Sequence, residues 1–285
     1  MHGYENMVAV IVLVATGLVL GLIIGAVVKF FGQESDPRLE QVEGLLPGAN
    51  CGACGFAGCG DFARALLGGE TDPATCPSSS AENVAKICAL LGITAGERHE
   101  KVAVVCCAGD NDRAARAAQY NGVNDCKDAM LVAGGAKGCQ YGCLGLGTCA
   151  RACPFGAIEI TDAGLAVVHP DLCTGCGKCV SACPRNIIKL VPASVPVHVL
   201  CSSPEKGAAK RKACEVACIG CRKCVKAAEE GQMIMDGFLA RVNVEDPPPV
   251  EICSVCPTHC LQPALNRQVD AAPKPAEQTR EAVNV

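Results

Sequence analysis

The chain contains no tryptophan, and only 3% of its 285 residues are aromatic. Aromatic side chains supply much of the buried area in ordinary cores, so a conventional large core is not expected. The five histidines are scattered, without an evident catalytic partner. The formal net charge of −4 is unremarkable for this length, and nothing indicates a nucleic-acid partner. No Gly-x-Gly-x-x-Gly turn lies between a strand and a helix, which argues against a Rossmann dinucleotide site.

Cysteine is abundant instead, with 24 residues in the chain. Disulfide scaffolds are typically short and secreted, whereas this chain is long. Its cysteines also recur as Cys-x-x-Cys-x-x-Cys, which is too close for most of them to pair without strain. We therefore expect metal–thiolate bonds, which would also cross-link the fold.

A single long apolar run extends from Val8 to Val28. It is long enough to cross a membrane as a helix. A signal peptide is the alternative, but a basic segment before the run and a small-residue cleavage pattern after it are absent. We therefore expect a single-pass membrane anchor. Lys29 and Arg38 follow the run, so the positive-inside rule predicts that the remaining chain lies in the cytoplasm.

The first cysteine group lies in the glycine-rich stretch LLPGANCGACGFAGCG and the segment that follows it. The glycines permit tight turns and expose backbone N–H groups that can hydrogen-bond to cluster sulfurs. Zinc is the alternative for any four cysteines, but the uneven spacing differs from the paired knuckles typical of zinc. One [4Fe–4S] cluster is predicted here, with the ligands Cys51, Cys54, Cys59 and Cys76.

The strongest pattern is CTGCGKCVSACP at residues 173–184, which is the bacterial Cys-x2-Cys-x2-Cys-x3-Cys-Pro run. In two-cluster ferredoxins the fourth cysteine of each run binds the other cluster, so a partner run is required. CQYGCLGLGTCARACP at residues 139–154 supplies it, with Leu146 at the usual second-ligand position and Cys139 as the expected substitute. Two [4Fe–4S] clusters follow, one on Cys139, Cys143, Cys149 and Cys183 and one on Cys153, Cys173, Cys176 and Cys179.

The residues between these runs, AIEITDAGLAVVHPDL, predict two short strands around a turn, as in a ferredoxin-like fold. The apolar run, NCGACGFAGC, GCLGLGTCARACPFGAI and CTGCGKCVSACPRNII together resemble the B subunit of the Rnf electron-transport complex, over residues 1–265. The resemblance implies a complex that passes electrons from reduced soluble ferredoxin towards NAD and pumps sodium ions or protons. It implies that this subunit is an iron–sulfur wire, with the NAD and flavin sites in other subunits.

Long-form members of that family carry a second ferredoxin-like pair, and CIGCRKCVKAAEEG at residues 218–231 resembles part of one. Three ligands of a fourth [4Fe–4S] cluster are predicted in it, Cys218, Cys221 and Cys224. The exchange rule, by which the fourth cysteine of each run binds the other cluster, places their fourth ligand in the next run. There Cys256 precedes a proline and is preferred over Cys260. The neighbouring cluster has lost its ligands, because Ala228 and DPPPV stand at their positions. A vestigial domain, empty or zinc-binding, is the alternative.

The remaining cysteines are less informative. Cys88 lies in a helical pattern and is predicted to be a small buried side chain. No role is predicted for Cys107 or Cys126. A further metal site is an open alternative for Cys201, Cys214, Cys253 and Cys260. A basic stretch at residues 205–213 is either a solvated loop or a docking patch for an acidic ferredoxin.

The sequence thus predicts an α+β protein with one N-terminal transmembrane helix, a small [4Fe–4S] domain, and tandem bacterial ferredoxin-like [4Fe–4S] domains. An electron carrier needs no acid, base or nucleophile, so no catalytic residue is predicted. A polyferredoxin subunit of a hydrogenase or formate dehydrogenase, and a non-redox zinc-binding membrane module, are the alternative functions. The predicted boundaries are 1–31 for the anchor, 32–92 for the [4Fe–4S] domain, 93–134 for a linking segment, 135–194 and 195–265 for the ferredoxin-like domains, and 266–285 for a disordered tail.

Overall fold

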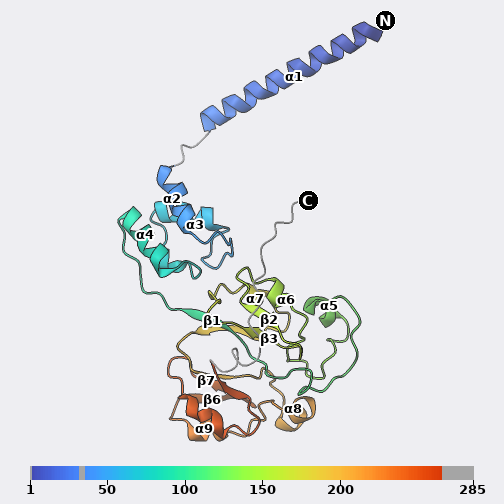
Figure 1. The fold of residues 1–285 in the computed structure, drawn as a ribbon, viewed down its shortest axis with the longest axis vertical. Helices are drawn as coiled ribbons and strands as arrows, with labels where there is room; N and C mark the ends of the chain where they lie inside the picture. The colour runs from blue at the N-terminus through green and yellow to red at the C-terminus, as the bar shows by residue number, and fades with distance from the viewer. Residues whose placement is uncertain (1, 32–35, 265–285) are drawn as a thin grey trace.

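The structure is a computed structural model that describes residues 2–31 and 36–264. Helix α1 (His2–Phe31) extends away from the other elements as one long helix (Figure 1). No residue of its most apolar stretch, Val10–Val27, is buried against the remainder of the protein. By length and composition α1 is a candidate membrane span, in agreement with the apolar run.

A small helical domain follows. It is built from α2 (Pro37–Leu45), α3 (Cys59–Leu67), the 3-10 turn η1 (Pro73–Thr75) and α4 (Ala81–Leu91). The Asp36 carboxylate caps α2 by accepting the N–H of Arg38 at 2.9 Å, and the Ser80 hydroxyl caps α4 by accepting the N–H of Asn83 at 3.1 Å. These caps fix where the helices begin, and their apolar faces meet in a core formed by Val42, Leu46, Phe62, Leu66 and Ile87. Cys88 lies in α4, as its helical pattern predicted, but it is only half-buried.

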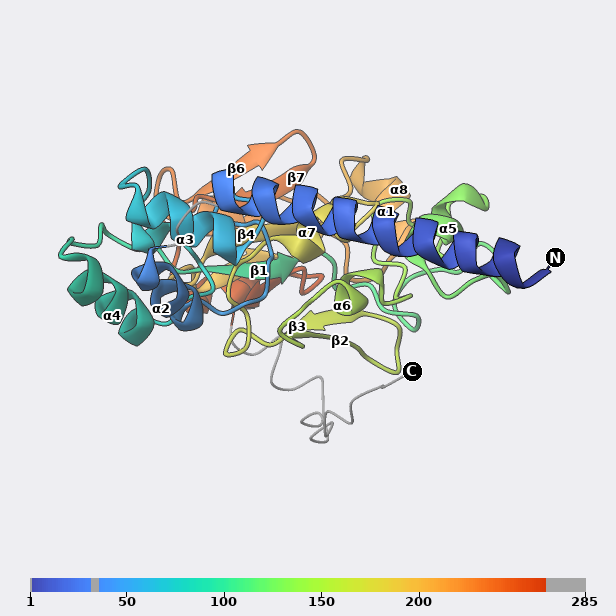
Figure 2. The same cartoon turned by 90° about the horizontal axis from the view of Figure 1, so that it is seen from above.

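The next unit is a small β structure in which two outer strands accompany a hairpin. Its elements are β1 (Lys101–Val105), α5 (Cys126–Leu131), α6 (Thr148–Arg151), β2 (Ile158–Ile160), β3 (Ala166–Val168), α7 (Lys178–Ala182) and β4 (Ile188–Pro192). Strand β1 pairs antiparallel with β4, and β2 pairs antiparallel with β3. Helix α6 lies beside the β2–β3 hairpin (Figure 2). This is the ferredoxin-like plan that the paired cysteine runs predicted.

A second unit repeats the plan. Its elements are β5 (Val197–Val199), α8 (Gly207–Ala213), α9 (Lys223–Ala227), β6 (Met233–Asp236), β7 (Leu239–Val242), the 3-10 segment η2 (Val250–Val255) and β8 (Leu261–Pro263). Strand β5 pairs with β8, and β6 pairs with β7. The backbone bonds just beyond the first strands also match: Cys106 N–H donates to the Ile187 carbonyl at 2.7 Å, and Leu200 N–H to the Cys260 carbonyl at 2.6 Å. The two units are therefore structural repeats.

One boundary differs from the expectation. Strand β1 falls inside the predicted linking segment, residues 93–134, yet it pairs with β4 and so belongs to the first ferredoxin-like unit. A long insertion separates β1 from the first cysteine run, so the sequence around that run contains no sign of it. The predicted tail, residues 266–285, lies outside the described residues.

Candidate iron–sulfur sites

The helical domain brings its four cysteines close to one another. Cys59 is the first residue of that helix, and its N–H donates to the Asn50 side-chain oxygen at 2.8 Å. Cys76 follows η1 and is buried in the same core, with Cys54 packed against it. Burial raises the pKa of the Cys54 thiol, and the nearby Cys76 and Cys51 thiolates raise it further. The structure thus brings the predicted first set together.

Three loops share one backbone design in the ferredoxin-like units. Each begins with a cysteine, has a glycine two residues later, and enters a short helix that carries another cysteine. The leading cysteines are Cys143, Cys173 and Cys218, and the glycines are Gly145 (φ +74°), Gly175 (φ +70°) and Gly220 (φ +69°). A backbone carbonyl faces each glycine so closely that no Cβ would fit without a shift. The N–H groups of Gly145 and Gly220 donate to the sulfurs of the cysteines two residues before them.

The second set lies where α7 meets the end of the first run. Four cysteines line one space of about 300 Å³: Cys153, Cys173, Cys176 and Cys179. The N–H of Ala103, in β1, donates to Cys173 Sγ at 3.4 Å. Burial raises the pKa of Cys179 to about 11, and the thiolates of Cys173, Cys176 and Cys153 add to the increase. This is the set that the exchange rule predicts.

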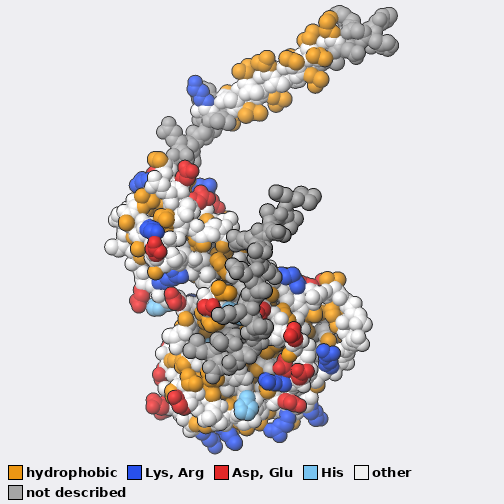
Figure 3. All heavy atoms as spheres, in the orientation of Figure 1, with side chains coloured by type: hydrophobic (Ala, Val, Ile, Leu, Met, Phe, Trp, Pro, Cys, Tyr) orange, Lys and Arg blue, Asp and Glu red, His pale blue; other side chains and the backbone are white. Residues whose placement is uncertain are grey.

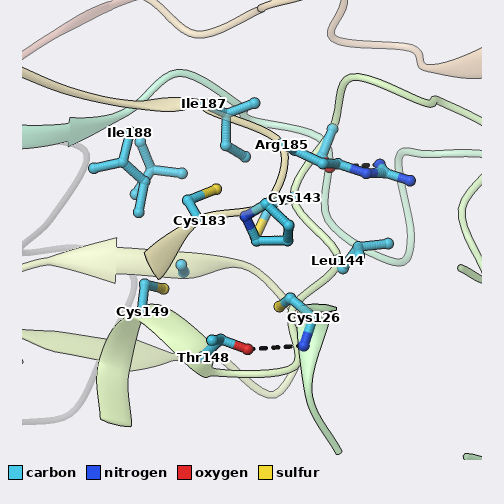
Figure 4. Close-up of a pocket in the computed structure, with 13 residues that line it drawn as sticks. Cys126, Cys143, Leu144, Thr148, Cys149, Cys183, Arg185, Ile187 and Ile188 are labelled. Atoms are coloured by element: carbon cyan, nitrogen blue, oxygen red, sulfur yellow. Dashed lines mark hydrogen bonds between the residues drawn. The ribbon is translucent and has the colours of Figure 1, made fainter. Parts of the chain in front are cut away.

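The third set differs from the prediction in one member. A space of about 350 Å³ is lined by Cys126, Cys143, Cys149 and Cys183, whose side chains face one another in Figure 4. Burial, and after it the neighbouring thiolates of Cys143 and Cys126, raise the pKa of Cys149 to about 12. Cys139 does not line this space; it lies in a separate one, with Cys107, Cys201 and Cys214.

Cys126 is held in place by the first residue of α6. Thr148 Oγ1 accepts the N–H of Cys126 at 2.7 Å (Figure 4) and donates to the Asp125 carboxylate at 2.9 Å. Arg151 joins the same carboxylate at 2.8 Å. The sequence offers only one feature near Cys126, the helix-capping residue Asp125, which marks Cys126 as the first residue of α5. Nothing in the spacing links Cys126 to the first run, because the connection is made through side chains.

The fourth set lies in the second unit. Cys218, Cys224 and Cys256 are buried in one core, and Cys221 is exposed. Cys260 is in the same core, with its sulfur 3.4 Å from Cys256 Sγ. A hydrogen bond from the Cys260 thiol lowers the pKa of Cys256 to about 5, and the pKa of Cys218 is also lowered, chiefly by a hydrogen bond from Cys260.

Backbone geometry separates Cys256 from Cys260. Cys256 (φ −82°, ψ 109°) has almost the conformation of Cys183 (φ −78°, ψ 111°) and Cys76 (φ −80°, ψ 108°), and a proline follows all three. Cys260 instead occupies the position of Ile187. The Ile187 carbonyl accepts the N–H of the residue after β1, and the Cys260 carbonyl accepts the N–H of the residue after β5. Cys256 is therefore the structural equivalent of Cys183, the last cysteine of its run.

Neighbouring sets contact one another. Ser78 Oγ lies 3.8 Å from Cys51 Sγ and 3.1 Å from Thr174 Oγ1, which connects the helical domain to the first ferredoxin-like unit. Burial is the main cause of the raised pKa of Cys176, and the Cys51 thiolate contributes. The Cys179 thiolate likewise raises the pKa of Cys149, although burial and the neighbouring thiolates of Cys143, Cys126 and Cys183 raise it more. The first three sets therefore form a row.

These groupings fit iron–sulfur clusters. The cysteines are buried or half-buried, apart from the exposed Cys221, they are free of disulfides, and backbone N–H groups point at several sulfurs. Within the described residues, no group of three or more His, Cys, Asp or Glu side chains is arranged to hold one metal ion. The lined spaces of about 300 and 350 Å³ lie between four cysteines each.

Comparison with known proteins agrees with this chemistry. A family model described as a putative Fe-S cluster matches residues 46–78, and a 4Fe-4S binding domain model matches residues 166–189. The B subunit of an ion-translocating oxidoreductase complex of Methanosarcina acetivorans is 42% identical over 90% of this chain and 96% of its own length. The B subunit of the Na(+)-translocating ferredoxin:NAD(+) oxidoreductase complex of Acetobacterium woodii is 41% identical over 86% of this chain and 74% of its own length.

The B subunit of a proton-translocating ferredoxin:NAD(+) oxidoreductase complex in Clostridium ljungdahlii is 43% identical over 75% of this chain and 76% of its own length. These matches extend far beyond the two short family models. By this similarity, the chain belongs to the family of B subunits of the ion-translocating (Rnf) oxidoreductase complexes.

Proposed function

We propose that this chain is the membrane-anchored electron-transfer subunit of an Rnf-type complex. It passes electrons from reduced ferredoxin towards NAD, while the whole complex translocates Na⁺ or H⁺. The observation that carries the proposal is the row of cysteine sets that begins in the helical domain next to α1 and continues through the ferredoxin-like folds. Relatives named as subunits of ferredoxin:NAD(+) oxidoreductase complexes support it.

The chain's own residues hold and tune the redox groups. A [4Fe–4S] cluster, when bound, takes up and releases one electron at a time. Cysteine thiolates would bind its irons, and N–H groups such as those of Ala103 and Ala240 donate to sulfurs and would favour the more negative, reduced state. The tight glycine loops keep the ligands fixed. No bond in a substrate is made or broken, so no catalytic side chain is needed.

We assign four ligand sets on the groupings described above. They are Cys51, Cys54, Cys59 and Cys76; Cys153, Cys173, Cys176 and Cys179; Cys126, Cys143, Cys149 and Cys183; and Cys218, Cys221, Cys224 and Cys256. Cys126 replaces Cys139 in the third set, because it shares the space with the other three members.

Soluble ferredoxin would dock near the fourth set. Cys221 is exposed there, so a redox partner can approach its cluster closely. Exposed basic residues surround that end: Lys206, Arg211, Lys212, Arg222, Lys223 and Lys226. Figure 3 shows Lys and Arg side chains at the end of the molecule farthest from α1. Lys210 from the same basic stretch is buried, so it is not part of this surface. An acidic ferredoxin would be steered to this end by charge.

The charge next to α1 supports a cytoplasmic position for the cysteine sets. Lys29 lies in the last turn of α1, on the side of the cysteine sets, so these sets would face the cytoplasm. Protease added to intact inverted membrane vesicles should then cleave the cysteine-bearing part, whereas protease outside intact cells should not. Cleavage only from outside cells would contradict this orientation.

Metal analysis tests the proposal as a whole. Anaerobically purified chain should contain iron and acid-labile sulfide in equal amounts, at least about 16 of each for four clusters. EPR-monitored reduction with ferredoxin should convert the clusters to their reduced state. Zinc without sulfide would overturn the proposal.

A pair of variants tests the fourth set. Cys256→Ala should remove one cluster's EPR signal, whereas Cys260→Ile should keep it, because Ile187 occupies the equivalent position in the first unit. The reverse result would assign the fourth ligand to Cys260.

A further inference from the structure

Four cysteines outside the assigned sets line a space between the two ferredoxin-like units. They are Cys107, Cys139, Cys201 and Cys214, and the space measures about 360 Å³. The spaces within the second and third sets measure about 300 and 350 Å³. The site between the units therefore has the size and the donor atoms of the assigned ones.

Each unit contributes an equivalent pair of these cysteines. Cys107 lies two residues after β1, and Cys201 lies two residues after β5. Cys139 lies four residues before Cys143 in the first unit, and Cys214 lies four residues before Cys218 in the second. The site is thus formed by the same two positions of a repeated fold.

The sulfurs receive backbone N–H groups as those in the assigned sets do. Cys143 N–H donates to Cys107 Sγ at 3.3 Å, and Cys218 N–H donates to Cys201 Sγ. Three of the four also accept the N–H of the residue two positions later, as Cys54 and Cys176 do; these donors are Tyr141, Ser203 and Val216. Such N–H···S bonds are a feature of iron–sulfur sites.

The insertion between β1 and the first cysteine run ties the two halves of the site together. Ala115 N–H donates to the Ala213 carbonyl at 2.9 Å, and Gly138 N–H donates to the Ala115 carbonyl at 2.7 Å. Ala114 forms a β-bridge with Cys214. One short segment therefore holds the residues next to Cys139 and Cys214 against each other.

A buried cation lies beside the site. Lys210 lines the space and is only 1% exposed, and its Nζ donates to the Phe238 carbonyl at 2.9 Å. Among the described residues, no carboxylate lies within ion-pair distance of it. A buried lysine without a counter-charge is costly. Four thiolates and an iron–sulfur core would supply the negative charge that Lys210 needs.

We propose that Cys107, Cys139, Cys201 and Cys214 hold a fifth iron–sulfur cluster of the cubane type, which links the two ferredoxin-like units. The role as a link rests on the proposed electron-transfer function. Cys143 and Cys218, the leading cysteines of equivalent loops in the two units, donate their backbone N–H groups to Cys107 and Cys201 of this site. An electron that enters near Cys221 therefore has a continuous route to the first unit, one electron at a time and without any bond being made or broken.

Two neighbouring cysteines offer a matched comparison. In the full-length chain, Cys107→Ala together with Cys214→Ala should lower iron and sulfide by about four each per chain, since it removes two ligands of one cluster. Adding Cys139→Ala should cause no further loss. Cys106→Ala is the control, because Cys106 is adjacent to Cys107 but does not line this space. It should keep the full iron content.

The readouts are iron, sulfide and zinc per chain and the EPR spin count after reduction. About 20 irons in the native chain, falling to about 16 in the double variant, would support the fifth cluster. Unchanged iron in the double variant, or one zinc lost in place of four irons, would overturn it. If about 16 irons are retained, such a result rejects only the fifth cluster and remains consistent with four clusters. A native chain without iron and sulfide would reject the proposed function itself.

Discussion

Leu146 stands where the second ligand of a regular ferredoxin run would stand, so the first run cannot complete its cluster from its own loop. Cys126 reaches the same space from α5, guided by the hydrogen bond between its N–H and Thr148 Oγ1. Thr148 is adjacent to Cys149 in the same short helix, so one hydrogen bond couples the distant ligand to a local one. The insertion therefore contributes Cys126 to the space that Cys143, Cys149 and Cys183 line.

Single and double cysteine variants test this assignment. Cys126→Ala should remove one cluster's EPR signal, and adding Cys149→Ala should remove nothing further, because both side chains line one space. Cys139→Ala combined with Cys149→Ala should instead remove two clusters, about eight irons per chain. Full retention of every signal in Cys126→Ala would return the ligand role to Cys139.

The cysteine loops and their short helices are the elements that position ligands. Gly175 allows its loop to pass close to β1, since a Cβ there would collide with the Lys101 carbonyl oxygen. Gly156 has a similar backbone, φ +64° against +70°, but open space around it. Alanine at Gly156 would meet only backbone strain, whereas alanine at Gly175 would meet both backbone strain and a steric collision.

Replacing each glycine with alanine should have different consequences. Gly156→Ala should cost about 1 kcal/mol of stability, from the left-handed backbone alone. Gly175→Ala should cost roughly 1–3 kcal/mol more, because the loop must move away from β1, and it should release iron from the second set. The thermal midpoint for loss of cluster absorbance and the iron content measure both effects. Equal behaviour of the two variants would contradict a role for close approach.

Taken together, the cysteine sets extend from the exposed Cys221 to the helical domain, which is the path that the proposed electron-transfer function requires. The apolar stretch Val10–Val27 of α1, the candidate membrane span, is not buried against the remaining protein. Its removal should therefore affect location and leave the redox part intact.

Deleting residues 1–31 provides the corresponding test. The shortened chain, expressed without other subunits, should be recovered in the soluble fraction with the same iron and sulfide content as the full chain. The full chain under the same conditions should sediment with membranes. A shortened chain that loses its iron would show that α1 supports the fold.

The apolar run predicted the candidate membrane span, the cysteine spacing predicted the first ferredoxin-like unit and most of the cysteine groupings, and the family resemblance implied the second unit. Ligands that follow one another in one loop, such as Cys173, Cys176 and Cys179, have a fixed separation because the loop conformation is local. The exchange rule extended this to Cys153 and Cys183, since the repeated fold carries each fourth cysteine to the other cluster. The conformation shared by Cys183 and Cys256 similarly follows from the proline after each of them.

Only the folded structure places Cys126, and not Cys139, in the space that Cys143, Cys149 and Cys183 line. Only folding likewise brings Cys107, Cys139, Cys201 and Cys214 to one space. Their separations along the chain include a long insertion and a whole ferredoxin-like unit, so no local spacing encodes them. The pairing of β1 with β4, the hydrogen bonds of Ala115 and the burial of Lys210 bring these residues together. Such long-range contacts depend on how the strands pair and pack, which is a property of the assembled chain and of no single motif.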